Sequence, residues 1–593
     1  MVNAQRHSLA VELLHGSEAH ALLKDPAFLR QWEALEQLCP WSTVFQSVAF
    51  ATTWYDIYQG SYDPVLVFVR DEGGLHGLFL LARSPLQKDL VHVGGLHAEY
   101  QAWLAVPDRS NAFVAGAAAA LRKLGARSLR LHFAAPKLPL DDLVALSGSA
   151  VRVHVELHRR GWMAVDENGT ATASLRKKGN RSKLMRLGRQ GEVSLIQLQS
   201  SDELRKVIDR IAEFCDLRQG AINDSTPFQS DPLKRAFYLA MMDQPGLLHA
   251  TVLLAGRTLV AAHLGPIDGG CVSLGLITHS PFAASHSPAK LLMLMLAERL
   301  GRQGYAEFDL TPGGAYKLRF ATREDAVPSL EFFFSPSSYR RRRLRSRVAS
   351  MAMLASGAAG IDSRSVVKRL RKNTTVVLSV AKGPHRAGSA AVRRASKWAR
   401  DAGEFRIYRM TSDVASSLEM PNTMLRVNAI SELLQYAPAS SNDARRSRFL
   451  GEALRRLKSG QIAFTYAEGG LLLHHSWLIA NTKEAGSEFG HRYAFAEPAA
   501  LLWNGFTHPA ARGRGLHQAS IRTRVRYAAT HELAPNIVTG VRSDNGPSRH
   551  NIEKIGFEYV GSAWMKRRFG KTERWLTGSY LHSPDRIDES RAL

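Results

Sequence analysis

The sequence predicts an α/β protein of several lobes, with mixed central sheets flanked by helices. The first observation behind this prediction is the length of 593 residues, which is enough for about three to four domains and excludes a single small core. The second is a globular composition, with 45% hydrophobic and 22% charged residues. The third is the alternation of short β-like runs with helix-like runs in three separate regions of the chain.

The first region, residues 25–165, mixes both types of element. Two β-like runs flank the turn Asp71-Glu72-Gly73-Gly74 and predict a hairpin. An Ala-rich run with helical spacing and a further β-like run follow it. The expected elements are a helix at Phe28–Leu38, strands at Pro64–Arg70 and His76–Arg83, a helix at Asn111–Leu124 and a strand at Ser128–Phe133.

The second region, residues 166–335, begins with a basic segment that has seven Lys and Arg residues between Arg176 and Arg189. Ser201 is the expected N-cap of the first long helix after this segment. The expected elements are a strand at Glu192–Leu198, helices at Ser201–Gln219 and Asp231–Met242, a meander of Leu247–Ala255 and Thr258–Gly265, a strand at Cys271–Ile277, a helix at Ser287–Gln303 and a strand at Ala306–Leu310.

The fourth region, residues 403–580, repeats the order of elements of the second. This similarity indicates the duplication of one fold. The expected elements are a strand at Phe405–Met410, a helix at Asp443–Lys458, a hairpin of Gln461–Ala467 and Leu471–Ala480, a strand at Ala499–Phe506, a helix at Gly515–Thr530, a strand at Asn536–Arg542, a helix at Pro547–Ile555 and a strand at Phe557–Ser562.

Between these regions lies a basic linker, residues 336–402. Between Ser335 and Arg400, seventeen Lys and Arg residues against one acid, Asp362, account for 16 of the 25 net positive charges of the chain. Interleaved apolar residues such as Leu344 and Met351 would suit an amphipathic helix on an anionic membrane face, but a solvated linker is the default expectation. No nucleic-acid-reading motif accompanies the charge, so specific nucleic-acid recognition is not expected.

The three cysteines, Cys39, Cys215 and Cys271, are far apart and lack metal-ligand spacing. Neither a disulfide framework nor a metal site is expected. The chain shows no signal-peptide pattern and no run of the roughly 18 to 20 apolar residues that cross a bilayer. These features favour a soluble protein of the cytoplasm.

The segment Phe506–His517 lies between a predicted strand and a predicted helix. Gly513 and Gly515 allow main-chain amides to point inward without a Cβ in the way, and the helix N-terminus adds positive partial charge. An anion such as a pyrophosphate is expected there, with charge-assisted contacts from Arg512 and Arg514. The alternative is ordinary turn geometry, for which glycine is equally common.

The later segment Asn545–Phe557 opens with Asn-Gly-Pro and closes with Glu-Lys-Ile-Gly-Phe. With the previous segment, it makes residues 405–565 resemble GNAT N-acyltransferases. The resemblance implies coenzyme A binding by Arg512, Gly513, Arg514, Gly515, His517 and Asn545. That family usually has Gly or Ala in place of His517, and often a general-acid Tyr in place of Ile552. Isoleucine donates no proton, so the acid would be His550, Tyr559 or water.

A second constellation begins at His286-Ser287-Pro288-Ala289-Lys290. Ser287 is expected to cap a helix and to leave amides free for an anion. Asp309 is expected at the end of the next strand, where strand ends in open α/β sheets face ligand crevices. A loop with two glycines and the pair Tyr316-Lys317 follow it.

Residues 41–334, with these motifs, resemble the acetyltransferase domain of the CelD/BcsL family, which is linked to cellulose biosynthesis. Ala289 stands where that family has Gly. The resemblance implies two GNAT-like lobes, with the acyl donor held in the second by Ser287, Ala289 and Lys290. The candidate catalytic residues are Asp309 as a base or substrate-orienting carboxylate, Tyr316 as a proton donor and Lys317 as a charge stabiliser. Alternatively, Lys317 solvates a loop and Tyr316 packs on the core.

The combined prediction is a cytoplasmic acyltransferase of three GNAT-like lobes, which needs no metal. It would move an acyl group, with acetyl as the first expectation, from acyl-CoA to an amine or hydroxyl of a small molecule, a sugar or an exopolysaccharide or envelope precursor. One alternative is an aminoacyl-tRNA-dependent transferase of the FemABX kind, in which the basic linker holds the tRNA backbone. The other is a non-catalytic CoA-binding or scaffold protein, which Ile552 and Ala289 favour.

Overall fold

The computed structural model describes residues 10–84, 89–146, 151–165, 169–344, 400–423, 425–440, 443–568 and 571–583. By its tertiary contacts the chain divides into two compact units. Unit 1 comprises residues 1–212 and 228–374, and unit 2 comprises residues 213–227 and 375–593. Unit 1 therefore contains nearly all of the first and second predicted regions, and unit 2 contains the fourth.

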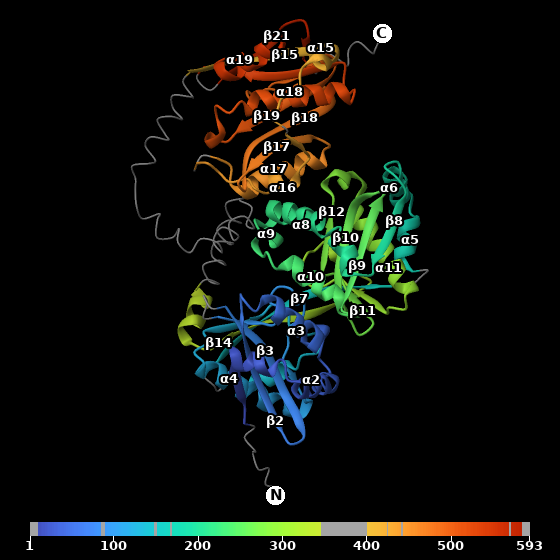
Figure 1. Ribbon diagram of the computed structural model, residues 1–593, viewed down its shortest axis with the longest axis vertical. Helices are drawn as coiled ribbons and strands as arrows, with labels where there is room; N and C mark the ends of the chain where they lie inside the picture. Colours follow the sequence, from blue (N-terminus) through green and yellow to red (C-terminus); the bar gives the residue numbers. More distant parts are fainter. Residues whose placement is uncertain are drawn as a thin grey trace. The chain divides into compact units, whose positions relative to one another are not determined.

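Unit 1 is built on one twisted sheet that runs through both of its predicted regions (Figure 1). Its strand order in the described residues is β1-β2-β3-β4-β6-β14-β7-β13-β11-β10-β9-β8, with β5 beside β3 and β12 beside β10. The strands are β1 (Glu12–His15), β2 (Asp63–Asp71), β3 (Gly74–Arg83), β4 (Leu90–His92), β5 (Leu104–Ala105), β6 (Ser128–Leu131), β7 (Arg152–Ala164), β8 (Val193–Leu198), β9 (Leu248–Ala255), β10 (Thr258–Asp268), β11 (Cys271–Ser273), β12 (Leu276–His279), β13 (Glu307–Asp309) and β14 (Arg323–Phe333).

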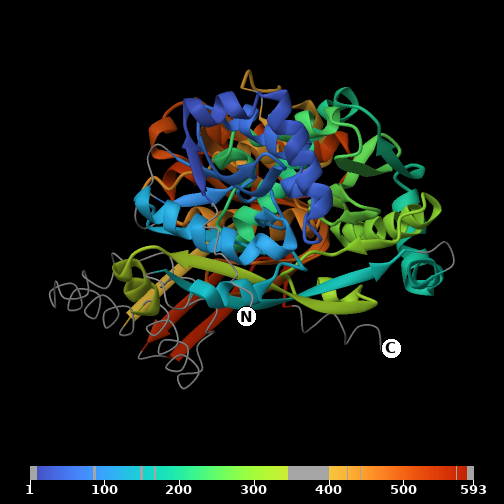
Figure 2. The same ribbon diagram turned by 90° about the horizontal axis from the view of Figure 1, so that it is seen from below.

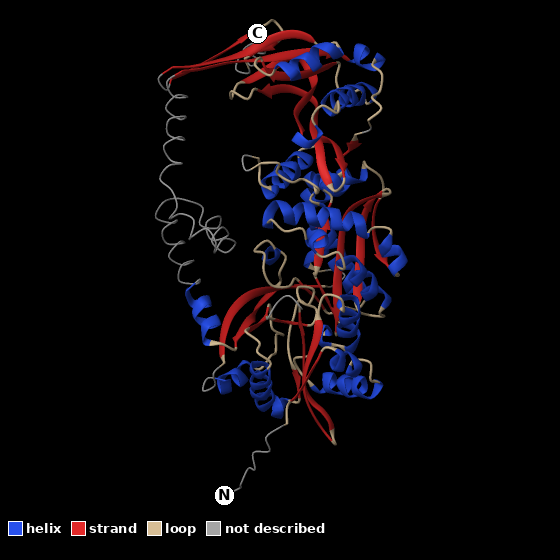
Figure 3. Cartoon of the chain, turned by 60° about the vertical axis from the view of Figure 1, so that its left-hand side comes forward, coloured by secondary structure: helices blue, strands red, loops and turns tan. Residues whose placement is uncertain are grey.

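Helices flank this sheet (Figure 3). The central one in the second region is α11, whose apolar residues face two core clusters, with Leu296 and Leu300 in one and Leu291 and Leu292 in the other. The helices are α1 (Ser17–Leu22), α2 (Pro26–Leu38), α3 (Val48–Tyr58), α4 (Ser110–Lys123), α5 (Thr170–Arg176), α6 (Lys178–Gly188), α7 (Ser201–Arg205), α10 (Lys234–Asp243) and α11 (Pro288–Arg302). Two more helices, α8 (Ile208–Asn223) and α9 (Pro227–Ser230), belong partly to unit 2, which includes residues 213–227.

Two long strands that the sequence analysis did not predict join the two regions of unit 1. β14 follows the second region but pairs with β6 of the first, and it is antiparallel to β7 along its whole length (Figure 2). The other edge of β7 pairs with β13 of the second region. A continuous hydrogen-bonded ladder therefore crosses the predicted boundary at residues 165 and 166.

Unit 2 has its own sheet, with the order β16-β17-β18-β19-β20-β15-β21-β22 and β23 beside β19 in the described part of the chain. Its strands are β15 (Arg400–Thr411), β16 (Arg426–Val427), β17 (Ile462–Glu468), β18 (Leu471–Gly486), β19 (Arg492–Thr507), β20 (Asn536–Arg542), β21 (Glu558–Arg568), β22 (Lys571–Thr577) and β23 (Leu581–His582). Its helices are α15 (Ser412–Ser417), α16 (Ile430–Leu433), α17 (Arg446–Lys458), α18 (Leu516–Thr530) and α19 (Gly546–Ile555).

Both units contain a parallel pair of strands that separates before a helix. In unit 2, β19 pairs with β20 only over residues 499–502, and then continues along β18 to Thr507. In unit 1, β11 pairs with β13 over residues 271–273, whereas β12 pairs with β10. The chain then enters α18 in unit 2 and α11 in unit 1. In each unit, a helix therefore begins after a strand that has left its parallel neighbour.

The predicted α/β class is confirmed, and so are the hairpin of β2 and β3 and the helices α2, α4, α11, α17, α18 and α19 within a few residues. Two details differ. The helix expected at 201–219 is two helices, and Ser200 rather than Ser201 caps the first by accepting from the Glu203 amide. The strand expected at 271–277 is interrupted at Gly275, which has φ 46°. The first part of the basic linker, residues 336–344, is helical, and Arg342 pairs with Glu331 at 2.8 Å. The remainder of the linker up to residue 399 lies outside the described residues.

Candidate active site

A cleft of about 680 Å³ lies in unit 2 where β19 has separated from β20. Its volume is within the range of about 300–1,000 Å³ that is usual for small-molecule sites. The sequence analysis assigned six residues of this unit to coenzyme A, and five of them line the cleft: Arg512, Gly513, Gly515, His517 and Asn545. Residues far apart in the sequence therefore meet at one site.

The backbone of this cleft depends on two glycines. Gly513 has φ 80° and Gly515 has φ 74°, in the left-handed region that favours glycine. Gly515 is the N-cap of the 15-residue helix α18, so the first amides of that helix lack intrahelical partners. A Cβ at either glycine would meet no atom within 4 Å. The positive φ therefore favours glycine at both positions, and steric crowding of a side chain does not. A turn of this kind at a helix N-terminus suits a bound anion.

His517 lies in the first turn of α18 and lines the cleft. Its Nδ1 is 3.4 Å from the Asn551 amide nitrogen. Burial and the nearby charge of Arg524 together lower the pKa of His517 to about 4. The imidazole is therefore neutral at pH 7 and supplies hydrogen bonding rather than a positive charge to an anion.

The other predicted residues of unit 2 have different surroundings. Asn545 is the N-cap of α19 and accepts from the Ser548 amide at 3.3 Å. Arg514 does not line the cleft, and its guanidinium donates to Glu468 at 2.7 Å. In the structure, Arg514 therefore forms an ion pair at the surface and does not point to the cleft as an anion-binding residue would.

No side chain of the described residues is placed as an obvious general acid beside the cleft. Ile552 is 2% exposed and belongs to the core under α18. Tyr559 is 53% exposed and its hydroxyl hydrogen-bonds with the Ser562 hydroxyl at 2.8 Å. Neither Tyr559 nor His550 is among the residues that line the cleft.

A β-bulge lies at the edge of the same cleft. His475 of β18 is opposite Phe506, but Trp477 is opposite Trp503, so two residues of β19 face one residue of β18. Asn504, one of the two, has φ 47°, which is uncommon for a residue other than glycine. Bulges interrupt the hydrogen-bonded ladder and are frequent next to active sites.

In unit 1, the predicted turn before α11 has an unusual backbone at Ser287. This residue is the N-cap of α11 with φ 53°, and its hydroxyl makes no capping bond. Instead the hydroxyl accepts from Lys183 of α6 at 2.8 Å. Ala289 is already helical, so replacement of a glycine there by alanine carries no backbone strain. Lys290 follows it in the first turn.

The basic segment of the second region forms α5 and α6. It contains seven Lys and Arg residues from Arg176 to Arg189 and no Asp or Glu from Thr170 to Gln190. Most of these cations are exposed, while Lys183 reaches the Ser287 turn. A positively charged surface therefore adjoins the N-terminus of α11.

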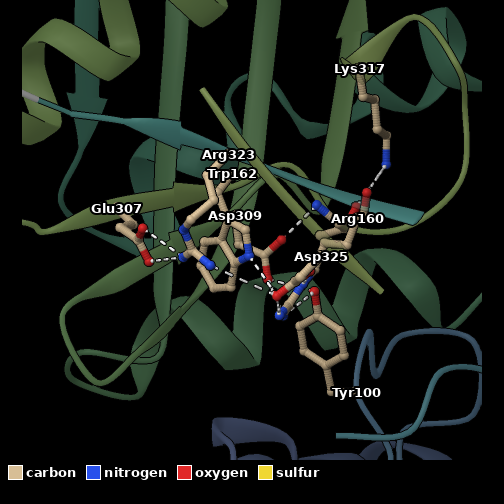
Figure 4. A network of polar contacts seen from close by, with 9 residues as sticks. Tyr100, Arg160, Trp162, Glu307, Asp309, Lys317, Arg323 and Asp325 are labelled. Atoms are coloured by element: carbon tan, nitrogen blue, oxygen red, sulfur yellow. Dashed lines mark hydrogen bonds and ion pairs between the residues drawn. The ribbon is translucent and has the colours of Figure 1, made fainter. Parts of the chain in front are cut away.

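Asp309 lies at the end of β13, as predicted, but it is 3% exposed and surrounded by donors (Figure 4). It accepts from the Tyr100 hydroxyl at 2.5 Å and from the Thr311 amide at 2.7 Å. Arg160 is 3.5 Å away. Burial raises the pKa of Asp309, and Arg160 opposes that shift. These contacts suit an orienting carboxylate better than an accessible base.

The same network continues across the strands that join the two regions (Figure 4). Arg160 of β7 makes a two-bonded ion pair with Asp325 of β14, which also accepts from the Trp162 indole at 3.0 Å. Arg323 pairs with Glu307 of β13 at 2.7 Å. The network therefore ties β7, β13 and β14 together.

Lys317 and Tyr316 do not converge on Asp309. The ammonium of Lys317 donates to the Thr311 hydroxyl at 2.7 Å and to the Pro312 carbonyl at 3.3 Å, and so closes its own loop. Burial lowers the pKa of Lys317. The Tyr316 side chain is 39% exposed.

One carboxylate near this loop was missed by the sequence analysis. Glu99 is half-buried between β4 and β5, and burial raises its pKa to about 7. Lys317 opposes that shift, whereas Asp309 adds to it. Such a pKa suits proton transfer near neutral pH. No motif or periodicity marks Glu99, because its environment is created by contacts that are distant in sequence.

Residues 174–319 match a family model described as an acetyltransferase (GNAT) domain. The match lies in unit 1 except for residues 213–227, which belong to unit 2, and it covers the Ser287 turn, Asp309 and Lys317. It implies a transferase that uses acyl-CoA and an acceptor. No curated protein matches the chain.

Several solved structures are similar to the chain at low identity. FemX is 10% identical over 51% of this chain and 95% of its own, with a TM-score of 0.36. The C-terminal domain of a putative lysylphosphatidylglycerol synthetase from Agrobacterium fabrum is 12% identical over 54% of this chain and 95% of its own, with a TM-score of 0.34. A tandem GNAT protein from the clavulanic acid biosynthesis pathway is 13% identical over 55% and 99%, with a TM-score of 0.33. At these values the similarities assign no activity to this chain.

The described residues contain no group of three or more His, Cys, Asp or Glu side chains arranged to hold a metal ion. Among the same residues, no helix has the length and apolar character required to cross a membrane.

Proposed function

We propose that the protein is an acyltransferase that moves an acyl group, with acetyl as the first candidate, from acyl-CoA to an amine or hydroxyl. The observation that carries the proposal is the cleft of unit 2, which gathers Gly513, Gly515 and Asn545 at the N-terminus of α18. The main-chain amides of that turn would bind the diphosphate, with Arg512 at the rim. The family match in unit 1 supports the same chemistry independently.

Direct acyl transfer requires little covalent chemistry from the protein. The acceptor nitrogen or oxygen attacks the thioester carbonyl and loses a proton, the carbon–sulfur bond breaks, and the thiolate leaves with a proton. The protein must align the reactants and stabilise the oxyanion. The bulge at Asn504 lies beside the cleft, where a main-chain amide released from the ladder would meet that oxyanion.

In unit 1 we propose a second donor site at the turn of Ser287, Ala289 and Lys290. Asp309 would orient the groups around it, Lys317 would hold the loop that follows, and Tyr316 would be a proton donor at the surface. Glu99, with a pKa near 7, is the better candidate for a base. The resemblance to the CelD/BcsL family makes a sugar or an exopolysaccharide precursor the proposed acceptor for this unit, in the cytoplasm.

A change at Gly515 tests the central proposal. In the full-length protein, Gly515→Glu should remove one acetyl-CoA binding event in titration calorimetry, because a carboxylate and bulk would stand where the diphosphate binds. Gly515→Asn is the matched control, since asparagine tolerates positive φ and carries no charge. Binding that survives Gly515→Glu unchanged would contradict the assignment of this cleft.

The charged surface of α5 and α6 favours one second candidate for unit 1. Seven cations without an intervening acid suit a polyanionic carrier, as an aminoacyl-tRNA-dependent transferase would require. Transfer that stops after RNase treatment would support this candidate, whereas transfer from acyl-CoA that is indifferent to RNase would contradict it. A membrane contact through the basic linker remains a proposal, because residues 345–399 lie outside the described part of the chain.

A further inference from the structure

Unit 2 contains a second cavity, of about 530 Å³, which shares Phe506 with the cleft described above. Asn504 lines this second cavity and Gly505 lines the cleft. The bulged segment of β19 therefore lies between the two spaces. An acyltransferase needs a space for the acceptor next to the donor site, and this cavity adjoins the cleft at the bulged segment.

One side of the second cavity is an aromatic wall. Tyr436 and Phe449 stack with their centroids 3.9 Å apart and their planes 11° apart. The ring centroids of Phe449 and His475 are 5.0 Å apart, and those of the stacked rings of His475 and Phe506 are 5.5 Å apart. Burial lowers the pKa of His475 to about 3, so the wall is uncharged at pH 7. A flat, apolar group is the ligand that such a wall recognises.

Part of the charge that lines this cavity is already neutralised within the protein. Arg456 is 5% exposed and lies over the Trp477 and Trp503 rings at 5.0 and 4.2 Å. It donates to Glu452 at 3.1 Å and to the Asn504 side chain at 2.9 Å. These contacts fix Arg456 as part of the wall rather than as a group available to a ligand.

Two further charges of opposite sign line the cavity, and neither forms an ion pair with another residue in the described ranges. Asp443 is half-buried and accepts only a main-chain bond, from Ser440 at 2.8 Å. Arg448 is exposed, near the start of α17. An aromatic wall with one carboxylate and one guanidinium at its edge is complementary to a zwitterion with a flat body.

We infer that this cavity binds the acyl acceptor of unit 2, and that the acceptor is a small aromatic molecule with both an amine and a carboxylate, of the aromatic amino acid class. The inference rests on the proposed function, because it names the substrate class of the same site. The ring packs on Tyr436, Phe449 and Phe506, the amine contacts Asp443, and the carboxylate contacts Arg448.

Four probes test each part of this ligand in the full-length protein. By calorimetry, L-phenylalanine should bind most tightly. We expect 2-phenylethylamine, which lacks the carboxylate, and 3-phenylpropionate, which lacks the amine, to bind about tenfold more weakly each. Glucosamine, an amine without an aromatic ring, should bind more weakly still. Equal binding of all four probes, or preference for glucosamine, would overturn the inference.

Two variants test where each end of the ligand is held. Asp443→Asn should weaken L-phenylalanine and 2-phenylethylamine about tenfold and leave 3-phenylpropionate unchanged. Arg448→Gln should weaken L-phenylalanine and 3-phenylpropionate and leave 2-phenylethylamine unchanged. The controls are Asp413→Asn and Arg445→Gln, which change exposed side chains outside the cavity and should have no effect on any probe.

Titration of the same preparations with acetyl-CoA distinguishes a failure of this inference from a failure of the proposed function. Intact acetyl-CoA binding without selectivity among the probes would overturn the acceptor class and leave the donor cleft standing. Selective L-phenylalanine binding without acetyl-CoA binding would contradict the proposed function and leave the ligand class of the cavity standing. Thiol release from acetyl-CoA that depends on L-phenylalanine would support both.

Discussion

At the scale of single residues, a buried environment decides what the polar groups of this protein do. Gly513 and Gly515 were singled out from the sequence because they lie between a predicted strand and a predicted helix, and the structure adds that both have positive φ. The roles of Asp309 and Lys317 were harder to read. Their partners, Tyr100 for Asp309 and Thr311 for Lys317, are set by tertiary contacts and loop geometry that no local pattern reports.

Glu99 should make the stability of unit 1 depend on pH, and the direction of that dependence can be checked. Its pKa is raised from 4.5 to about 7 in the folded protein, so the folded state binds more protons than the unfolded state between these values. Stability therefore falls as the pH rises through this window. Glu99→Gln removes the penalty and should stabilise unit 1 by about 1–3 kcal/mol at pH 8, with no gain near pH 4.5.

Urea unfolding at pH 5, 6.5 and 8 measures this difference. The exposed residue Glu72, in the turn between β2 and β3, provides the control. Glu72→Gln should change stability equally at each pH. A Glu99→Gln effect that is also independent of pH would show that Glu99 has an ordinary pKa.

At the scale of elements, periodicity located most helices and strands, but it missed β7 and β14. Both strands carry polar and apolar residues without the strict alternation that marks a half-buried strand. β7 in particular contains Arg159 and Arg160 in mid-strand. Their pairing was not predictable from the local sequence, since about 160 residues separate the partners.

The ion pair of Arg160 should hold this pair of strands together. Arg160→Leu leaves Asp325 and Asp309 without their common cation, so we expect a loss of about 3–5 kcal/mol in the stability of this part of unit 1. Hydrogen exchange followed by mass spectrometry would measure the loss on peptides from β7 and β14.

The neighbouring residue Arg159 provides a matched control. It is 71% exposed and pairs with Glu324 at the surface. Such surface pairs contribute about 0–1 kcal/mol, so Arg159→Leu should change the exchange of the same peptides little. Equal effects of the two variants would contradict the structural role of Arg160.

At the scale of the whole molecule, the sequence predicted repeated α/β regions and a basic linker, and the structure divides into two units, with residues 213–227 assigned to the second. The second and the fourth region each contain one parallel pair of strands in the described part of the chain, β11 with β13 and β19 with β20. The exact domain boundaries, the cytoplasmic location and the acceptor of unit 1 stay predictions. They depend on contacts and partners that a single chain does not encode locally.

The central claim is that unit 2 holds an acyl-CoA by the turn that starts α18. A crystal structure of the full-length protein with acetyl-CoA tests it most directly. We predict that the diphosphate lies within hydrogen-bonding distance of the main-chain amides between Gly513 and His517. A diphosphate bound elsewhere in unit 2, with that turn left unused, would contradict the claim.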